Sequence, residues 1–260
     1  MLIQTHKLKK YFYKDNLCIT AVDEIDFSIQ PGEFVGILGS SGSGKTTFAR
    51  ILGGLVAADS GKILFNNISL ELSNAAAKRH YYRHVQYIFQ DAAASFYPNH
   101  TLSQALSEPL LHQNYSKQQI HQILPQLLRQ VSLPAEYKNR YPYQLSGGEA
   151  QRAAIARAIG SQPQLLICDE ITSALDTINQ QQIINLLLQL QKEKQLSIIF
   201  ITHDIALAGS CCQKIYIMEQ GKFIESGPAA TIIRNPRQPL TIKLLQAAAA
   251  INHLETEKPS

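Results

Sequence analysis

Two glycine-rich segments contain residues whose types and spacing could bind phosphate. The first, GSSGSGKTT at residues 39–47, matches the pattern G-x-x-x-x-G-K-[ST] in full. Glycines allow backbone N–H groups to turn inward around phosphate groups, and a following helix adds its positive N-terminal end. The second segment, LSGGE at residues 145–149, precedes an alanine-rich stretch and contains no lysine. The chain therefore carries two potential phosphate cradles, of which only the first has the lysine that usually completes such a site.

The first segment predicts a site for nucleotide phosphates. Lys45 would reach the β- and γ-phosphates as a point charge, and the Thr46 hydroxyl would ligate Mg²⁺. A buried strand, GEFVGILG, precedes the segment, and apolar residues at helical spacing follow it, so the strand, loop and helix that such a site needs are present. A glycine-rich turn without a ligand is the alternative, which the full match disfavours. The other residues expected to contact the nucleotide are Gly39, Ser40, Ser41, Gly42, Ser43, Gly44 and Thr47.

An acidic pair ends a predicted buried strand in LLICDE, residues 165–170. Carboxylates at the C-terminal end of a parallel strand lie where open α/β sheets bind ligands. Asp169 would hold the Mg²⁺ shell, and Glu170 would act as general base on the attacking water, or at least orient it. The alternative is an ordinary strand end with two exposed acids, which is a weaker explanation beside a phosphate loop.

Two single residues end further apolar strands. Gln90 follows YIF and could ligate Mg²⁺ and water through its amide, whereas His203 follows IFIT and could hydrogen-bond a γ-phosphate. Taken alone, a surface glutamine and a capping or core histidine explain these positions equally well. On this argument, the roles of Gln90 and His203 stay open.

Composition and charge limit the function classes. The 260 residues, 45% hydrophobic and 17% charged, suffice for one or two globular domains. The net charge of +4 is spread along the chain. The densest basic cluster, Lys7, Lys9 and Lys10, is too small to indicate a nucleic-acid surface and is more typical of a solvated face.

Cysteine spacing and hydropathy bear on the compartment. The four cysteines show no CxxC spacing, which favours a reduced, cytosolic protein. The apolar runs are strand-sized, and the start MLIQTHKLKKYF lacks a signal-peptide pattern, so we expect a chain that neither spans a membrane nor is exported.

The element pattern predicts an α/β fold. Residues 18–29 alternate as an antiparallel strand does, 116–131 and 180–192 have helical spacing, and 92–160 reads as a helical insertion. KIYIMEQGKFIESG predicts a hairpin that turns at Gln220-Gly221, and an alanine-rich helix follows Pro239. Strands that alternate with helices indicate a mainly parallel sheet.

Taken together, these motifs resemble the nucleotide-binding subunit of an ABC transporter. In order along the chain they are the phosphate loop at 39–46, Gln90, LSGGE at 145–149, LLICDE at 165–170, SALD at 173–176 and His203. The resemblance implies a P-loop NTPase (RecA-like) core with a mainly parallel sheet, an antiparallel β subdomain and a helical insertion. It places the nucleotide-binding core at residues 1–90 and 161–235, the helical signature subdomain at 91–160 and an appendage at 236–260. It also implies ATP hydrolysis with Mg²⁺, and roles in it for Gln90 and His203.

The resemblance also explains the second cradle. In this family the signature segment of a second, like subunit completes the site around the γ-phosphate, so two ATP molecules lie between two subunits arranged head to tail. Ser146, Gly147, Gly148 and Glu149 would contact the opposite ATP, and Asp176 would lie at the seam.

An aromatic residue in this family stacks on adenine. We assign this role to Phe12, with Tyr11 or Tyr13 as alternatives and core packing as the explanation without a ligand.

Within the family, several stretches resemble the peptide/nickel importer branch. They are QDAAASFYPNHTLSQALSEPL, RYPYQLSGGEAQRAAIARAI and NPRQPLTIKLLQA. The branch implies uptake of peptides, nickel or metal chelates, an extracytoplasmic solute-binding protein, a second ATPase subunit, and permease subunits contacted near residues 91–110. It implies a peripheral location on the cytoplasmic face of the inner (plasma) membrane and no nucleic-acid partner. Ile171 and the pair Phe96-Tyr97 depart from the family pattern. The departure at Phe96-Tyr97 leaves the cargo open.

Two rival classes fit the motifs less well. ABC ATPases that act on DNA or ribosomes usually carry long coiled-coil insertions or two cassettes, and this sequence has neither. P-loop kinases share the glycine loop but have no reason to contain LSGGE and SALD.

Overall fold

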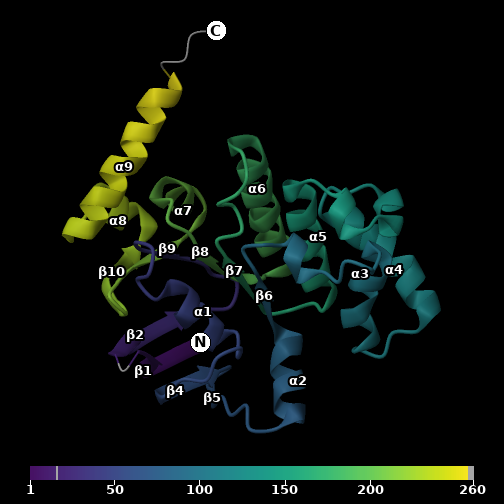
Figure 1. The fold of residues 1–260 in the computed structure, drawn as a ribbon, viewed down its shortest axis with the longest axis horizontal. Helices are drawn as coiled ribbons and strands as arrows, with labels where there is room; N and C mark the ends of the chain where they lie inside the picture. The colour runs from purple at the N-terminus through teal and green to yellow at the C-terminus, as the bar shows by residue number, and fades with distance from the viewer. Residues whose placement is uncertain (16, 257–260) are drawn as a thin grey trace. The chain divides into compact units, whose positions relative to one another are not determined.

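The computed structural model describes residues 1–15 and 17–256 of the chain (Figure 1). It separates into two compact units, one formed by Met1–Ser73 with Ser197–Ser260 and the other by Asn74–Leu196. Among the described residues, no helix combines the length and apolar character needed to cross a bilayer.

The first unit contains two sheets and four helices in its described part. Its strands are β1 (Ile3–Lys14), β2 (Leu17–Ile29), β3 (Phe34–Leu38), β4 (Ser60–Phe65), β5 (Ile68–Ser69), β8 (Ser197–Ile201), β9 (Lys214–Glu219) and β10 (Lys222–Pro228). Its helices are α1 (Lys45–Leu52), α7 (Ile205–Cys211), α8 (Ala229–Arg234) and α9 (Pro239–Thr256).

A largely parallel set of strands forms the centre of this unit, in the order β10-β9-β3-β8. Every residue of β3 and β8 is buried, as their continuous apolar sequences predict. The two strands run parallel with Ile37 opposite Ile201, so their C-terminal ends meet at one edge of the sheet. The predicted hairpin is β9–β10, and its turn residues Gln220 and Gly221 both have positive φ, 47° and 80°. That backbone twist is the one that closes a two-residue hairpin.

The predicted antiparallel subdomain is a separate sheet with the order β2-β1-β4-β5. Its strand β2 covers the residues whose alternation predicted a strand, and Val22, Ile25 and Phe27 are buried. Phe27 packs edge-on against Phe48 of α1 with ring centroids 5.3 Å apart. The helix that follows the phosphate loop is thereby packed against this sheet.

The second unit is mainly helical. Its strands are β6 (Val85–Ile88) and β7 (Leu165–Asp169), its helices are α2 (Ala75–His84), α3 (Leu102–Leu111), α4 (Lys117–Gln130), α5 (Gly147–Gly160) and α6 (Thr177–Lys194), and its short 3₁₀ turns are Ala93–Ser95, Ala135–Asn139 and Pro142–Gln144. β6 and β7 pair in parallel with Ile88 opposite Cys168, so they too end at one edge. Helices α3, α4 and α5 pack against one another (Figure 1).

Most of the expected elements are present with adjusted bounds. The helix predicted at 116–131 is α4, and the described residues between 92 and 160 contain helices and turns but no strand. The helix after the phosphate loop ends earlier than its spacing predicts, because Gly53 and Gly54 follow Leu52, and Leu55 is exposed. Helices α2, α7 and α8 were not anticipated. The division at residues 90, 160 and 235 stays a prediction.

Candidate functional site

The phosphate loop leaves β3 and is seated against two neighbouring backbones of its unit. Gly39 and Gly44 have φ values of 156° and 105°. A Cβ at Gly39 would lie 2.1 Å from the Met218 carbonyl oxygen, and one at Gly44 would lie 2.1 Å from the Ala21 carbonyl oxygen. Only glycine fits such an approach, so the spacing of the glycines is fixed by β9 and β2 as well as by any ligand.

The lysine of the loop is held inside it. Lys45 is only 4% exposed, and its Nζ donates hydrogen bonds to the carbonyl oxygens of Gly39 at 2.9 Å and Ser40 at 2.8 Å. Ser43 is also buried, and its Oγ has no hydrogen-bond partner among the described residues. A buried ammonium and an unsatisfied buried hydroxyl are groups that a polyanion would satisfy.

Helix α1 begins without an intrinsic cap. Its N-cap is Gly44, which has no side chain to cap the helix, and the first turn contains no acidic residue. The start of a helix presents N–H groups without intrahelical partners and a partial positive charge, which favour an anion. Thr46 and Thr47 are half-buried in this first turn. Ser40, Ser41 and Gly42 are exposed on the open side of the loop.

His203 lies at the same sheet edge as the phosphate loop. It follows β8 directly after buried Thr202 and is exposed. Because β8 runs parallel to β3, the chain leaves both strands at the edge where Gly39 begins the loop. The structure thus brings together the loop and the histidine, which sequence reasoning placed at separate strand ends.

Phe12 lies in β1 and is 43% exposed. The Lys10 Nζ is 5.4 Å from the centre of its ring. Tyr13 is 81% exposed and Tyr11 is half-buried. This exposure disfavours core packing for Phe12, but it leaves the choice between Phe12 and Tyr13 as the adenine contact a prediction.

The acidic pair of the second unit has two different environments. Asp169 is 5% exposed, and the Tyr87 hydroxyl donates a 2.6 Å hydrogen bond to its Oδ2. Glu170 is half-buried and adopts a φ of 51°, in the left-handed region. A non-glycine residue in that region is uncommon, and such conformations concentrate at functional sites. Tyr87 was not anticipated as the partner of Asp169.

A short hydrogen-bond chain links the glutamine to the acidic strand end. The Gln90 Nε2 donates to the Ser173 Oγ at 3.2 Å, and this hydroxyl donates to the Glu170 carbonyl oxygen at 2.9 Å. Because β6 and β7 end side by side, Gln90, which follows β6, and Asp169, the last residue of β7, lie at one edge of the sheet. The carboxylate of Asp169 and the amide oxygen of Gln90 are hard oxygen donors, as is the Thr46 hydroxyl, and this donor type suits Mg²⁺.

The signature segment forms the start of α5. Ser146 is its N-cap: the Ser146 N–H donates to the Glu149 Oε2 at 2.8 Å, and the Glu149 N–H donates to the Ser146 Oγ at 3.3 Å. The Tyr137 hydroxyl donates to the other oxygen of Glu149 at 2.8 Å. The backbone N–H of Ser146 is the main cause that holds the pKa of Glu149 below its ordinary value. Gly147 is exposed in the first turn.

Asn179 connects the signature segment to the segment that contains Asp176. Asp176 is the N-cap of α6 and accepts hydrogen bonds from the Asn179 N–H at 2.9 Å and Nδ2 at 2.6 Å. A Cβ at Gly148 would lie 2.6 Å from the Asn179 Oδ1. The glycine thus permits the close approach of α6 to α5. Asp176 has a capping role that sequence reasoning did not assign.

A second unanticipated contact fixes the segment after Gln90. The Arg157 guanidinium donates to the Ser95 carbonyl oxygen at 2.7 Å and to the Ser95 Oγ at 2.9 Å. It also lies 4.4 Å from the ring centre of Phe96, which is buried. Phe96 departs from the family's sequence pattern, and in the structure its ring forms this cation–π contact with Arg157.

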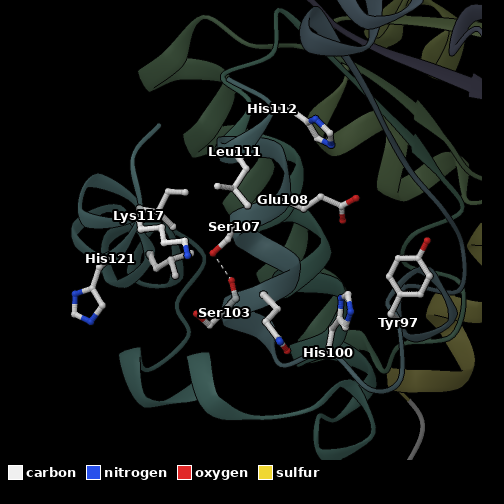
Figure 2. Close-up of a pocket in the computed structure, with 12 residues that line it drawn as sticks. Tyr97, His100, Ser103, Ser107, Glu108, Leu111, His112, Lys117 and His121 are labelled. Atoms are coloured by element: carbon white, nitrogen blue, oxygen red, sulfur yellow. Dashed lines mark hydrogen bonds between the residues drawn. The ribbon is translucent and has the colours of Figure 1, made fainter. Parts of the chain in front are cut away.

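A cavity of about 540 Å³ lies between α3 and α4, and its lining begins at Tyr97, directly after Phe96. Figure 2 shows Tyr97, His100 and Glu108 on one side of it and Lys117 and His121 on the other. Apart from Leu111, the α3 part of this lining lies within the stretch 91–110 that the sequence predicts to contact a membrane partner.

The sequence model of the ABC transporter family matches residues 22–173. The chain belongs to the ABC transporter family. The ABC cassette is 39% identical over 241 residues to the oligopeptide transport ATP-binding protein OppF of Salmonella typhimurium, covering 92% of this chain and 72% of that protein. It is also 39% identical to the glutathione import ATP-binding protein GsiA of Pectobacterium atrosepticum, covering 88% of this chain and 37% of that longer protein.

Solved structures of ABC cassettes share the fold. One is the dimeric post-hydrolysis state of the ATP-binding cassette MJ0796 bound to ADP and Pi, with a TM-score of 0.80, 27% identity, and coverage of 87% of this chain and 98% of that one. Another is cbiO1 of Clostridium perfringens, with a TM-score of 0.81, 26% identity and coverage of 98% of both chains. The predicted P-loop NTPase fold is confirmed, and the protein is an ATP-binding ATPase of the ABC type.

Proposed function

We propose that this cassette powers an importer for peptides, nickel or metal-chelate solutes. The observation that carries the proposal is the similarity to OppF, an oligopeptide transport protein, over 92% of the chain. A relative named for glutathione import supports the same direction of transport and a peptide-like cargo.

The loop in the first unit binds the substrate's phosphates. Lys45 moves its donors from the loop carbonyls to the β- and γ-phosphate oxygens, and the uncapped amides of α1 donate to the same group. His203, at the same sheet edge, donates to the γ-phosphate. Phe12 stacks on the adenine with its exposed face.

Mg²⁺ fits the oxygen donors of this chain. Thr46, Gln90 and Asp169 would hold the ion, and when bound it neutralises charge that develops on the transferred phosphoryl group. The Tyr87 hydroxyl donates to the Asp169 Oδ2 and thereby helps to fix the orientation of the carboxylate.

Glu170 accepts the proton of the attacking water. Its backbone lies in the left-handed region, and its carbonyl oxygen accepts a hydrogen bond from the Ser173 hydroxyl. Gln90 donates to the same serine, so a movement of the segment after Gln90 is transmitted to the base. This link supports a coupling between the membrane partner and hydrolysis.

The signature segment contacts the ATP of a second subunit. The capping interaction of Ser146 uses an oxygen lone pair, so its O–H proton stays available as a donor. Gly147 and Gly148 add backbone N–H groups, Glu149 holds the turn, and Asp176 lies at the seam. MJ0796, a cassette of similar fold, is dimeric, and this supports a pair of subunits, which we propose to be arranged head to tail.

The cavity in Figure 2 and the adjoining residues of 91–110 receive the permease subunits. The cassette then works as a peripheral subunit at the cytoplasmic face of the membrane, with a solute-binding protein on the other side. No nucleic acid takes part in this function.

Deletion of the gene from its host tests the cargo and the importer assignment. Uptake of a radiolabelled tripeptide or of radioactive nickel should fall to background. The wild-type gene should restore the lost uptake, whereas a Glu170→Gln gene should not. If the deletion strain takes up both solutes at the parental rate, the importer assignment is wrong.

A further inference from the structure

A second cavity in the unit formed by Asn74–Leu196 is basic. It has a volume of about 550 Å³ and lies between α2, the end of α3 and the end of α5. Its lining includes Arg79, His80, Arg83, His112, Gln113 and Ser161. None of these residues takes part in the nucleotide site or in the cavity of Figure 2, with the exception of His112, which borders both cavities.

The charges of this cavity have one sign. Arg79 and Arg83 are four residues apart on α2 and therefore share one face of the helix. The described lining contains no carboxylate, and neither arginine forms an ion pair with a described residue. Guanidinium groups in the wall of a cavity, without an ion-pair partner, attract an anion rather than a cation.

A buried donor points to the same ligand. The Gln113 Nε2 is shielded from solvent and has no hydrogen-bond partner among the described residues. An unsatisfied buried N–H group costs free energy unless a ligand or water accepts from it. Ser161, 6% exposed, donates its hydroxyl proton to the Ala158 carbonyl oxygen at 2.7 Å, so the serine is already committed as a donor.

The pKa of the neighbouring His84 responds to the basic surroundings of the cavity. Burial is the main cause that lowers the pKa of His84, and the neighbouring His80 and Arg83 lower it further. His84 lines the adjoining recess with Arg83 and Gln113. The half-buried Tyr82 and Pro109 complete the wall of the cavity and offer apolar surface. A volume in this range accommodates a small organic molecule.

We propose that this cavity binds a phosphate monoester with a small apolar body, at a site separate from the nucleotide. Two guanidinium groups on one helix face match the oxygens of a phosphate, the Gln113 amide donates a further hydrogen bond, and Tyr82 with Pro109 covers the apolar part. The phosphate can belong to a soluble metabolite or to a lipid headgroup, because the chemistry that is recognised is the same.

The test uses phenyl phosphate as the probe and the full chain saturated with Mg²⁺ and a non-hydrolysable ATP analogue, so that the phosphate loop is occupied. Calorimetric titration should show one saturable site, and benzyl alcohol should not bind. The double variant Arg79→Gln/Arg83→Gln should lower the affinity for phenyl phosphate by about 10- to 100-fold, the loss expected for charge-assisted hydrogen bonds. Arg129→Gln, an exposed arginine of α4 outside the cavity, is the matched control and should leave the affinity unchanged.

A second variant, Gln113→Leu, tests the proposal independently in case the double variant misfolds. Gln113→Leu keeps the side-chain volume but removes the buried donor, and it should weaken the probe several-fold without lowering the melting temperature. Flotation with vesicles that contain phosphatidic acid identifies the source of the phosphate, because a lipid ligand would carry the wild-type protein, but not the double variant, to the top of the gradient. Absence of saturable binding in both assays overturns the proposal, as does binding that the arginine and glutamine variants leave unchanged.

Discussion

The chain contains two helices that start from glycine-rich segments, and the two starts are built differently. Helix α1 begins at Gly44, has no capping side chain and no acidic residue in its first turn. Helix α5 begins at Ser146, which forms a complete capping box with Glu149. The first start leaves its amides and its positive end for a ligand, whereas the second already carries a carboxylate of its own. A glycine-rich sequence alone therefore does not define a phosphate site.

The supports of the two segments differ as well. Gly39 and Gly44 lie against backbone carbonyl oxygens of the same unit, which fixes the loop before any nucleotide arrives. The closest approach to Gly148 comes from the end of the Asn179 side chain, which can move. A rigid loop with a buried lysine can bind phosphate alone, whereas the signature segment, on the proposed function, needs the lysine and metal of another subunit to offset the charge of Glu149.

Substitution of Glu170, the proposed general base, should reduce ATP hydrolysis more than any other change. Glu170→Gln should keep nucleotide affinity but reduce turnover by about 10²- to 10⁴-fold, because the amide cannot accept a proton. The variant should also accumulate an ATP-bound dimer. Steady-state hydrolysis and size-exclusion chromatography with ATP measure the two effects. Glu193→Gln, an exposed residue of α6, is the control. Turnover within about threefold of wild type would remove Glu170 from this role.

Ser146→Arg asks whether the second segment acts across subunits. Monomer affinity for Mg-ATP should stay unchanged, because the first cradle is intact. Turnover should fall by about 10²- to 10³-fold, as when a transition-state donor is lost, and the dimer of the Glu170→Gln background should disappear.

A mixture sharpens this test. Ser146→Arg subunits combined with Lys45→Ala subunits form one dimer in which both lesions fall in the same ATP site. The other site of that dimer is intact, so some hydrolysis should return if one site suffices. A loss of ATP affinity in the Ser146→Arg monomer would show that the segment acts within its own chain.

Lys45→Ala probes the first cradle directly. Loss of a buried ammonium that donates to phosphate should weaken a fluorescent ATP analogue by about 10- to 100-fold and reduce turnover as well. Equilibrium titration checks the affinity. Unchanged affinity together with unchanged turnover would contradict the phosphate-loop assignment.

Ser146→Ala separates capping from ligand contact. The loss of the N-cap should cost about 1 kcal/mol in the free energy of unfolding. Ser116→Ala removes an equivalent capping box from α4 and should cost a similar amount. Only Ser146→Ala should also lower turnover, so denaturant unfolding and hydrolysis assays on the pair distinguish the two roles. Equal turnover in both variants would assign Ser146 a purely structural role.

The smallest effect is a pH dependence of stability from Glu149. Hydrogen bonds from Ser146 and Tyr137 hold the pKa of Glu149 below its ordinary value of 4.5. A carboxyl group with a lowered pKa in the folded state stabilises the fold above its unfolded pKa, and that contribution is lost as pH falls through the folded value. Wild-type stability should therefore decline more than that of Glu149→Gln as the pH falls from 5 toward 3, a window set by this lowered pKa. Parallel unfolding curves for the two proteins across this range would contradict the prediction.

Local sequence predicted the elements whose residues interact with near neighbours. The apolar runs of β3, β7 and β8 are buried along their whole length, and the periodicity of α4 produced a helix within the predicted range. Helix α2 escaped prediction because only Tyr81 of AAAKRHYYRH is buried, so the sequence has no apolar stripe to detect.

Residue types at fixed spacing were enough to predict the family, the ATPase activity and the positions of the phosphate loop, the acidic pair and the signature segment. The tertiary structure alone decided which distant groups hold these residues in place. Tyr87 reaches Asp169, Asn179 approaches Gly148, and Arg157 clasps Ser95 and Phe96. These contacts join residues on different elements, and no local pattern encodes a distance that is set only when strands pair and helices pack.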